Sequence, residues 1–521
     1  MIHMAQLSEL DTAFLYLESD HTPMHNGGLY LFDATTQSPP LSFDQFKQFI
    51  ESNLSAADFF RKRLVEAPLK LDRPHWVDDP EFNLNRHLHH AEYGHPTSLP
   101  ELNQLAAKLL ATPLKRDRPL WEITFVDNLA NIDTLPAASF AIIVKIHLAA
   151  INPLSGKDVM SVLLDFSATA KELGKPAPWH PKSSPSTVKR WSNAYAIALN
   201  SPFRLATRAK ETLSGTVYTR LLRQLTNPNL HPERLDVPRT TINRRINADR
   251  SLECIEIPLA RLKNIKNKIG HDVTINDVIV GICAQTVNRF LASQDEHPNM
   301  PLTAMTPISV RSKNLHRPTG NQMAAMMISL ATDEPNPAWR VVHIHQSALT
   351  SASYSQAVSA TSLTKAVPSS LIGLAARIYA EFQLAQRHRP LFNLPLTNIP
   401  GPQKPLYLQG RQLVRQASTA PLFDGIGLGI VAISYHGAVT FSVNSCPSRV
   451  CDAGLIVALL DESVTDIENA AEGILEQEPP TYTPKPITKP SPTEIGSAMI
   501  KNVFALFNNL FHIEKNQHGK N

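Results

Sequence analysis

A histidine ends a strongly apolar run in the N-terminal third of the chain. The run extends from Phe140 to His147, and it is followed by Leu148 and, four residues further on, by Asn152. A neutral imidazole can accept the proton of a hydroxyl group that attacks a carbonyl carbon, so His147 is a candidate general base. Leucine and asparagine side chains do not accept a proton at neutral pH. His147 is therefore the only imidazole that this segment offers.

The position of His147 at the end of an apolar strand limits what its ring can reach. The run predicts a buried central strand, and neighbouring side chains at a strand end point to opposite faces. We expect His147 to point away from the space that Leu148 faces and to be satisfied within the protein. The alternative is that the ring of His147 reaches the space that Leu148 faces and acts there as a base, which would require a one-residue slip that disturbs the packing of the strand.

Several blocks of this chain resemble those of the bacterial wax ester synthase/acyl-CoA:diacylglycerol acyltransferase family. They occur in the family's order, over roughly residues 7–475: Leu7 to Glu18, Pro23 to His25, Arg118 to Glu122, Asn276 to Val278, Val310 with Arg311, Gly320 with Asn321, Asn398 to Pro402, and Ser434 with Tyr435. Each block alone is a weak signal, but so many in register are not expected by chance.

The resemblance identifies residues 147–153 as a degenerate copy of the family's His-His-x-x-x-Asp-Gly motif. It implies that the second histidine of that motif is the general base and that the aspartate fixes the local turn and the imidazole. In this chain His147 takes the first position, Leu148 takes the second, and Asn152 and Pro153 replace the Asp and Gly. Loss of a general base typically lowers a rate by about 10²–10⁴.

The resemblance also implies roles for residues outside this motif. Asn276 would contact the oxyanion or the acceptor alcohol. The supporting motif positions are Pro119, Trp121, Glu122, Asp277, Arg311, Asn398 and Gly401. Each has a structural alternative: Asn276 can cap a helix, Trp121 can belong to the core, and Arg311 can anchor a carboxylate. A rigid turn is the alternative for residues 398–402.

The fold implied by the resemblance is α/β, with two lobes of the CoA-dependent, chloramphenicol acetyltransferase-like type and a tunnel between them. We expect an N-terminal lobe (1–174), a basic helical connector (175–249), a C-terminal lobe (250–476) and a Pro-rich linker with an amphipathic tail helix (477–521). Hydrophobic periodicity predicts the following elements: helices at Phe43–Asn53, Leu99–Leu110, Lys157–Ala168 and Ile275–Ser293, and strands at Phe140–His147, Leu428–Tyr435 and Ala438–Asn444.

Charge and cysteine content restrict the partners. The net charge is +4, yet Lys175 to Arg250 contains fourteen Lys and Arg against four acids. This basic stretch suits lipid headgroups or CoA phosphates, or it is a solvated helical face. We expect no nucleic acid, because no aromatic-glycine signature accompanies the stretch. The four cysteines fit free thiols in a reducing compartment, and we expect no metal site.

The N-terminus lacks the pattern of a secretory signal, and no apolar stretch approaches the length of a membrane span. We therefore expect a cytoplasmic protein, peripheral on the inner membrane face or on lipid inclusions. Two interpretations of function remain. The first is an O-acyltransferase without a bound cofactor that uses acyl-CoA as co-substrate and diacylglycerol or a long-chain alcohol as acceptor, with activity impaired by the degenerate motif. The second is a non-catalytic paralogue that binds acyl-CoA or lipid, and the motif favours it for this copy.

Overall fold

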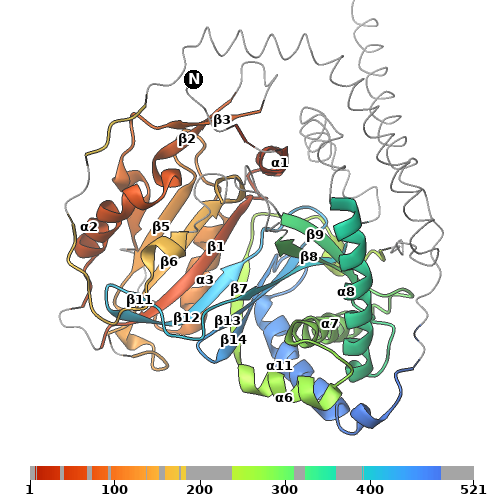
Figure 1. The fold of residues 1–521 in the computed structure, drawn as a ribbon. Helices are drawn as coiled ribbons and strands as arrows, with labels where there is room; N and C mark the ends of the chain where they lie inside the picture. The colour runs from red at the N-terminus through yellow and green to blue at the C-terminus, as the bar shows by residue number, and fades with distance from the viewer. Residues whose placement is uncertain are drawn as a thin grey trace, which may run out of the picture. The chain divides into compact units, whose positions relative to one another are not determined.

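Two six-stranded sheets with their covering helices make up most of the described structure (Figure 1). The computed structural model describes residues 6–480 and 482, except residues 8, 36–39, 67–72, 92–95, 137, 152–158, 175–177, 183–236, 310–322, 360–389 and 391. Most of the expected connector (175–249) and of the expected tail (477–521) therefore lies outside the described residues.

The N-terminal sheet has the strand order β11-β12-β1-β6-β5-β4. Its strands are β1 (His25–Asp33), β4 (Leu88–His90), β5 (Trp121–Val126), β6 (Phe140–His147), β11 (Tyr407–Leu408) and β12 (Arg411–Thr419). All eight residues of β6 are buried, because this strand lies between β1 and β5 and both faces of the sheet are covered. The prediction of a buried central strand over Phe140–His147 is confirmed.

One helix packs on each face of this sheet. Helix α2 (Phe43–Asn53) buries Phe46 and Ile50 in the cluster that contains the even-numbered residues of β6. Helix α3 (Leu99–Ala111) packs against the odd-numbered residues of β6 and β1. The sequence predicted the start of both helices, since Ser42 forms a capping box with Gln45 and Ser98 accepts from the backbone of Glu101.

Smaller elements surround the N-terminal sheet. They are α1 (Glu9–Leu17), α4 (Val159–Leu163) and the hairpin of β2 (Lys62–Val65) and β3 (His75–Asp78). The described helix α4 is shorter than the predicted helix over Lys157–Ala168. It ends before Asp165, because this residue leaves the helix to pair its backbone with Tyr407.

The C-terminal sheet has the order β7-β14-β13-β10-β8-β9. Its strands are β7 (Ser251–Pro258), β8 (Thr303–Ser309), β9 (Met323–Ser329), β10 (Leu394–Pro400), β13 (Leu428–Tyr435) and β14 (Ala438–Ser445). Its helices gather beside it in Figure 1: α6 (Leu259–Ile269), α7 (Ile275–Ser293), α8 (Pro337–Ser359) and α11 (Ala453–Ala470). Helix α7 has the predicted bounds, because Thr274 and Asp277 form a capping box at its start.

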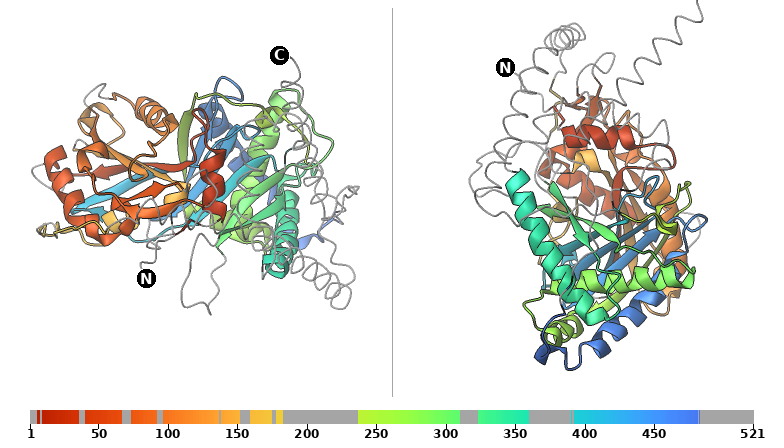
Figure 2. Two further views of the ribbon diagram at one scale, coloured as in Figure 1. Left: turned by 90° about the horizontal axis from the view of Figure 1, so that it is seen from above. Right: turned by 90° about the vertical axis from the view of Figure 1, so that its right-hand side faces the viewer.

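Two strands from the second half of the sequence complete the N-terminal sheet. Strand β12 pairs antiparallel with β1, from Gly27 opposite Thr419 to Asp33 opposite Gln412. In Figures 1 and 2 these light-blue strands run beside the red β1. The expected lobe boundaries (174 and 250) stay a prediction, but the expected C-terminal lobe supplies one edge of the N-terminal sheet.

Candidate active site

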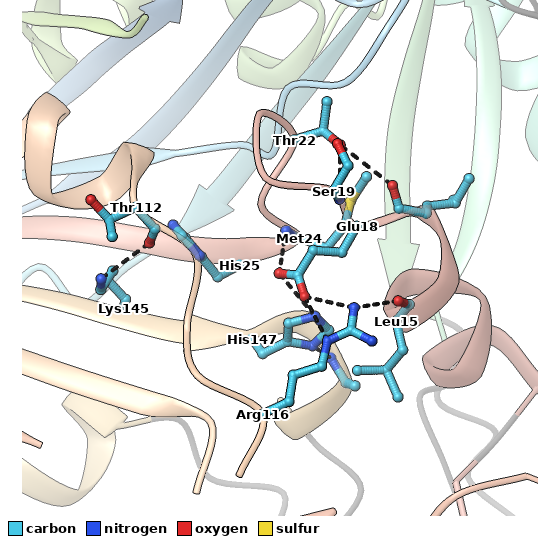
Figure 3. Close-up of polar contacts among 12 residues, drawn as sticks. Leu15, Glu18, Ser19, Thr22, Met24, His25, Thr112, Arg116, Lys145 and His147 are labelled. Carbon is cyan, nitrogen blue, oxygen red and sulfur yellow. Dashed lines mark hydrogen bonds and ion pairs between the residues drawn. The ribbon is translucent and has the colours of Figure 1, made fainter. Parts of the chain in front are cut away.

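His147 closes β6 with a fully buried ring, 1% exposed. Its Nδ1 accepts a hydrogen bond of 3.0 Å from the backbone N–H of Ala149, so the ring caps the short 3-10 turn Leu148–Ala150. Because Nδ1 accepts, the neutral ring carries its proton on Nε2. This Nε2 lies 3.6 Å from Oε1 of Glu18 and makes no hydrogen bond (Figure 3). Neither nitrogen therefore presents a lone pair to a substrate hydroxyl.

The surroundings of His147 keep its ring neutral. Burial lowers the pKa of His147 to about 3, and the positive charge of Arg116 and the neighbouring His25 add to this effect. The contact with Glu18 is consequently not an ion pair at neutral pH. A ring with so low a pKa is a weak base for a hydroxyl proton, because proton transfer is most efficient when the pKa is close to the working pH.

A buried carboxylate holds the segment between α1 and β1 against the end of β6. Glu18 accepts hydrogen bonds from Nε and Nη2 of Arg116, at 3.0 and 2.7 Å, and from the backbone N–H of Met24 at 3.2 Å. Arg116 also donates to the carbonyl of Leu15 at 2.5 Å. The sequence blocks include Glu18 but indicate no role for it, and they give no sign of Arg116.

The structure describes Leu148, at the replaced histidine position of the motif, but not Asn152, at the replaced aspartate position. Leu148 follows β6 directly, is half-buried, and donates its backbone N–H to the carbonyl of Met24 at 2.9 Å. Its side chain has no group that could exchange a proton. Asn152 lies outside the described residues. The assignment of both as replaced positions stays a prediction.

Two residues from separate sequence blocks meet in the C-terminal sheet. Asn276, on the first turn of α7, accepts a hydrogen bond of 3.1 Å on its side-chain oxygen from the amide of Asn398 on β10. Its neighbour Asp277 caps α7 and also contacts Nδ1 of His345 on α8 at 2.8 Å. Asp277 thus ties two helices together, and His345 is a partner that the sequence blocks do not contain.

Gly401 is required by its contact with the neighbouring strand. Its backbone N–H donates to the hydroxyl of Ser434 at 3.1 Å, and a Cβ atom at this position would lie 2.3 Å from the carbonyl oxygen of Ser434. Two of the sequence blocks are therefore joined here by a close approach of β10 and β13 that only glycine permits.

The Pro-Leu-Trp-Glu block belongs to the core of the N-terminal sheet. Pro119 is buried, and Trp121 is fully buried and donates its indole N–H to the carbonyl of Phe60 at 3.0 Å. Glu122 forms an ion pair of 2.8 Å with Lys145 of β6. Arg311, the remaining supporting position, lies outside the described residues. No hydrogen bond or ion pair of the described residues joins His147 to Asn276.

The described part of the chain lacks a metal-ligating cluster and a membrane-spanning helix, features that are typical of other protein classes. It contains no group of three metal-ligating side chains. None of its helices is both long and apolar enough to cross a bilayer. All four cysteines are free thiols.

Comparison with protein families gives a match along most of the chain. The wax ester synthase/diacylglycerol acyltransferase catalytic domain matches residues 7–279, and the C-terminal domain of the same family matches residues 319–468. The chain belongs to the wax ester synthase/diacylglycerol acyltransferase family. The resemblance of the sequence blocks is thereby confirmed.

Relatives within this family align over almost the whole chain. The O-acyltransferase WSD of Acinetobacter baylyi is 26% identical over 473 residues, which cover 88% of this chain and 96% of that protein. The probable diacylglycerol O-acyltransferase tgs2 of Mycobacterium tuberculosis is 28% identical over 470 residues, covering 88% and 98%. Alignments of this extent include residues of both six-stranded sheets.

Solved structures confirm the expected fold class. The wax ester synthase/diacylglycerol acyltransferase from Marinobacter aquaeolei VT8 matches with a TM-score of 0.62 at 22% identity, covering 90% of this chain and 100% of that one. The first condensation domain of the calcium-dependent antibiotic synthetase matches with a TM-score of 0.53 at 13% identity, covering 91% and 98%. At these identities the likeness concerns the fold alone, an α/β fold of the CoA-dependent acyltransferase type.

Proposed function

We propose that this chain binds acyl-CoA and a lipid alcohol, and that it transfers the acyl group much more slowly than a relative with the complete His-His-x-x-x-Asp-Gly motif. The acceptor is diacylglycerol or a long-chain alcohol, and the product is a triacylglycerol or a wax ester. Membership of the family supports the substrate class. The low rate is supported by the leucine at the second motif position and by the ring of His147, whose Nδ1 accepts from Ala149 and whose Nε2 carries the proton, so that neither nitrogen offers a lone pair.

The reaction needs a proton acceptor for the attacking hydroxyl, donors for the developing oxyanion, and two substrates held together. His147 does not supply the first, because Nδ1 holds Ala149 and Nε2 carries the proton beside Glu18. Asn276 can supply the second through its amide N–H groups, since Asn398 already occupies its oxygen. Proximity and oxyanion stabilisation then remain, and they sustain a residual rate without an imidazole.

A non-catalytic paralogue is the second candidate function. Leu148 favours it, because an aliphatic side chain stands where the family resemblance places the base. Such a protein would bind acyl-CoA or lipid without turnover. Under both proposals it works in the cytoplasm, peripherally on the inner membrane face or on lipid inclusions, with the basic stretch from Lys175 to Arg250 near phosphate groups. Co-sedimentation with anionic liposomes should then weaken as salt rises, and salt-independent binding would contradict this placement.

Release of CoA from palmitoyl-CoA, with hexadecanol or diacylglycerol as acceptor, tests the proposal. The unaltered chain is compared with the double variant Leu148→His/Asn152→Asp, which restores the histidine and the aspartate of the motif and keeps Pro153. We expect the double variant to be about 10²–10⁴-fold faster, as the loss of a general base implies. Binding of acyl-CoA without turnover in the unaltered chain would favour the non-catalytic paralogue.

The variant His147→Ala tests whether His147, at the first histidine position of the motif, acts as the general base in place of the second histidine. We expect little change in the slow turnover of the unaltered chain beyond what a loss of folded protein explains. Turnover of the unaltered chain at the rate of the double variant, abolished by His147→Ala, would show that His147 is the base and would overturn the proposal.

A further inference from the structure

A pocket that His147 and Leu148 do not line lies where the two sheets meet. The space between its lining atoms amounts to about 350 Å³, a volume that includes open solvent at its mouth. We call it the junction pocket, and the lining residues used below are His25, Leu110, Arg250, Leu252, Thr419 and Asn444. They come from β1, α3, the start of β7 and the ends of β12 and β14. Elements of both sheets therefore build the pocket.

His25 contributes a buried hydrogen-bond acceptor without a partner. The ring is 3% exposed, and its Nε2 donates to the carbonyl of Leu110 at 2.6 Å. This bond fixes the tautomer, so Nδ1 carries a lone pair. Nδ1 is buried and makes no hydrogen bond. A buried acceptor left unsatisfied destabilises the fold, and a ligand hydroxyl that donates to it would remove that cost.

Arg250 contributes hydrogen-bond donors to the same pocket. Nη1 donates to the carbonyls of Asn247 and Asp249, at 2.5 and 2.8 Å, and Nη2 donates to the carbonyl of His21 at 2.6 Å. These three bonds use three of the five N–H groups of the guanidinium, all of them on neutral carbonyls. Two N–H groups remain for an acceptor on a ligand.

The other polar side chains of the junction pocket are already satisfied. Asn444 exchanges two hydrogen bonds with the backbone of Ala420, and Thr419 donates to the carbonyl of Gly27. Leu110 and Leu252 give the pocket an apolar wall. The groups open to a ligand are thus one acceptor and one cationic donor, beside apolar surface.

We propose that the junction pocket binds the polar end of a hydroxy ester with apolar chains, whose hydroxyl donates to Nδ1 of His25 and whose ester carbonyl accepts from Arg250. The proposal deepens the proposed function, because it makes His25 and Arg250 the residues that distinguish a partial glyceride from a simple long-chain alcohol. A simple alcohol satisfies His25 but leaves the two guanidinium N–H groups without a partner.

The charges around the pocket favour a neutral ligand of this kind. Arg250 and Lys145 of β6 both act on His25, which disfavours a cationic ligand. A carboxylate has no proton to offer the lone pair of His25. Burial lowers the pKa of His25 to about 3, so the ring stays an acceptor at neutral pH. A hydroxyl with an adjacent carbonyl meets both requirements.

Calorimetric titration of the full chain with 1,2-dioctanoylglycerol and with 1-decanol, in the same detergent and without acyl-CoA, tests the proposal. The variant His25→Gln keeps an amide donor toward Leu110 but has no acceptor at the position of Nδ1, whereas His25→Asn keeps an oxygen there. We expect His25→Gln to bind both probes about 10-fold more weakly, and His25→Asn to stay within about 3-fold.

Arg250→Met should weaken the binding of dioctanoylglycerol about 10-fold and leave the binding of decanol nearly unchanged. Only dioctanoylglycerol has an ester carbonyl that loses its donor in this variant. The ratio of the two affinities is the decisive readout, since a loosened junction would weaken both probes together. An unchanged ratio in a folded Arg250→Met variant, wild-type affinity in a folded His25→Gln variant, or no binding of either probe to the unaltered chain would overturn the proposal. Binding is measured without turnover, so an inactive enzyme leaves this test intact.

Discussion

The amide of Asn398 donates to the side-chain oxygen of Asn276 across 3.1 Å, although 122 positions separate the two residues in the sequence. The bond fixes which end of the Asn276 amide faces its surroundings. If Asn276 stabilises the oxyanion, Asn398 positions it.

Asn398→Ala should therefore lower the CoA-release rate of the Leu148→His/Asn152→Asp variant about 10-fold, with little effect on KM. The amide of Asn276 would lose the partner that orients its N–H groups. Asn276→Ala should lower the rate at least as much, and both alanine changes together in the same background should lower it no further. Additive effects of the two alanine changes would show that the residues act independently.

Acid should destabilise the fold through His25 and His147. Each ring has a folded pKa of about 3 and an unfolded value near 6.5, so the unfolded chain binds more protons between these pH values. The contribution of these two histidines to the free energy of unfolding is fully present above about pH 6.5. It falls toward pH 3, by up to about 1.4 kcal/mol per pH unit for each histidine. Urea unfolding between pH 7 and 4.5 measures the slope.

His147→Asn gives the matched comparison for that slope. Its side-chain oxygen can still accept from Ala149, but the group no longer titrates. We expect a shallower dependence of the unfolding free energy on pH than in the unaltered chain. Equal slopes in the two proteins would mean that His147 does not keep its low pKa in solution.

Arg116→Met should destabilise the chain by about 2 kcal/mol. It leaves the carboxylate of Glu18, only 6% exposed, without its cation. Loss of one partner of a fully buried pair costs about 3–5 kcal/mol, and we discount this because Arg116 is 38% exposed. The double change Glu18→Gln/Arg116→Met should recover part of the loss, and urea unfolding of the two variants provides the measurement. A larger loss in the double variant would contradict the pairing.

Gly401→Ala should destabilise the chain by about 1–3 kcal/mol, because the new methyl group would meet the carbonyl oxygen of Ser434. Gly174→Ala is the matched control, since no atom lies within 4 Å of a Cβ at that position. We expect its stability to change by less than about 0.5 kcal/mol. Comparable melting temperatures of the two variants would contradict the close approach of β10 to β13.

Local sequence signals predicted those helices and strands whose ends are set by residues close to them in the sequence. Helix α7 begins at Ile275 because Thr274 and Asp277 form a capping box within four residues, and β6 is mostly apolar because both of its faces are covered. Pairs of distant residues gave no such signal. Glu18 and Arg116 are 98 positions apart, and nothing in the pattern around either residue indicates the other.

The same limit applies to the candidate site. The sequence predicted a His147 ring satisfied within the protein. Only the folded chain shows that Nδ1 accepts from Ala149, whereas Nε2 lies 3.6 Å from Glu18 and makes no hydrogen bond. Nothing in the sequence indicated that Nδ1 of His25 is a free acceptor. That depends on the hydrogen bond of Nε2 to the carbonyl of Leu110, near the C-terminal end of α3. Side-chain type predicts which chemistry is available, whereas tertiary contacts decide which lone pair is left.

The pairing of β12 with β1 has a consequence for how the chain is made. While the ribosome has synthesised only the first few hundred residues, β1 has β6 on one side and an open row of backbone N–H and C=O groups on the other. That edge is closed only when residues 411–419 emerge. A nascent or truncated chain that stops before them carries an exposed strand edge, which invites pairing with other chains and aggregation.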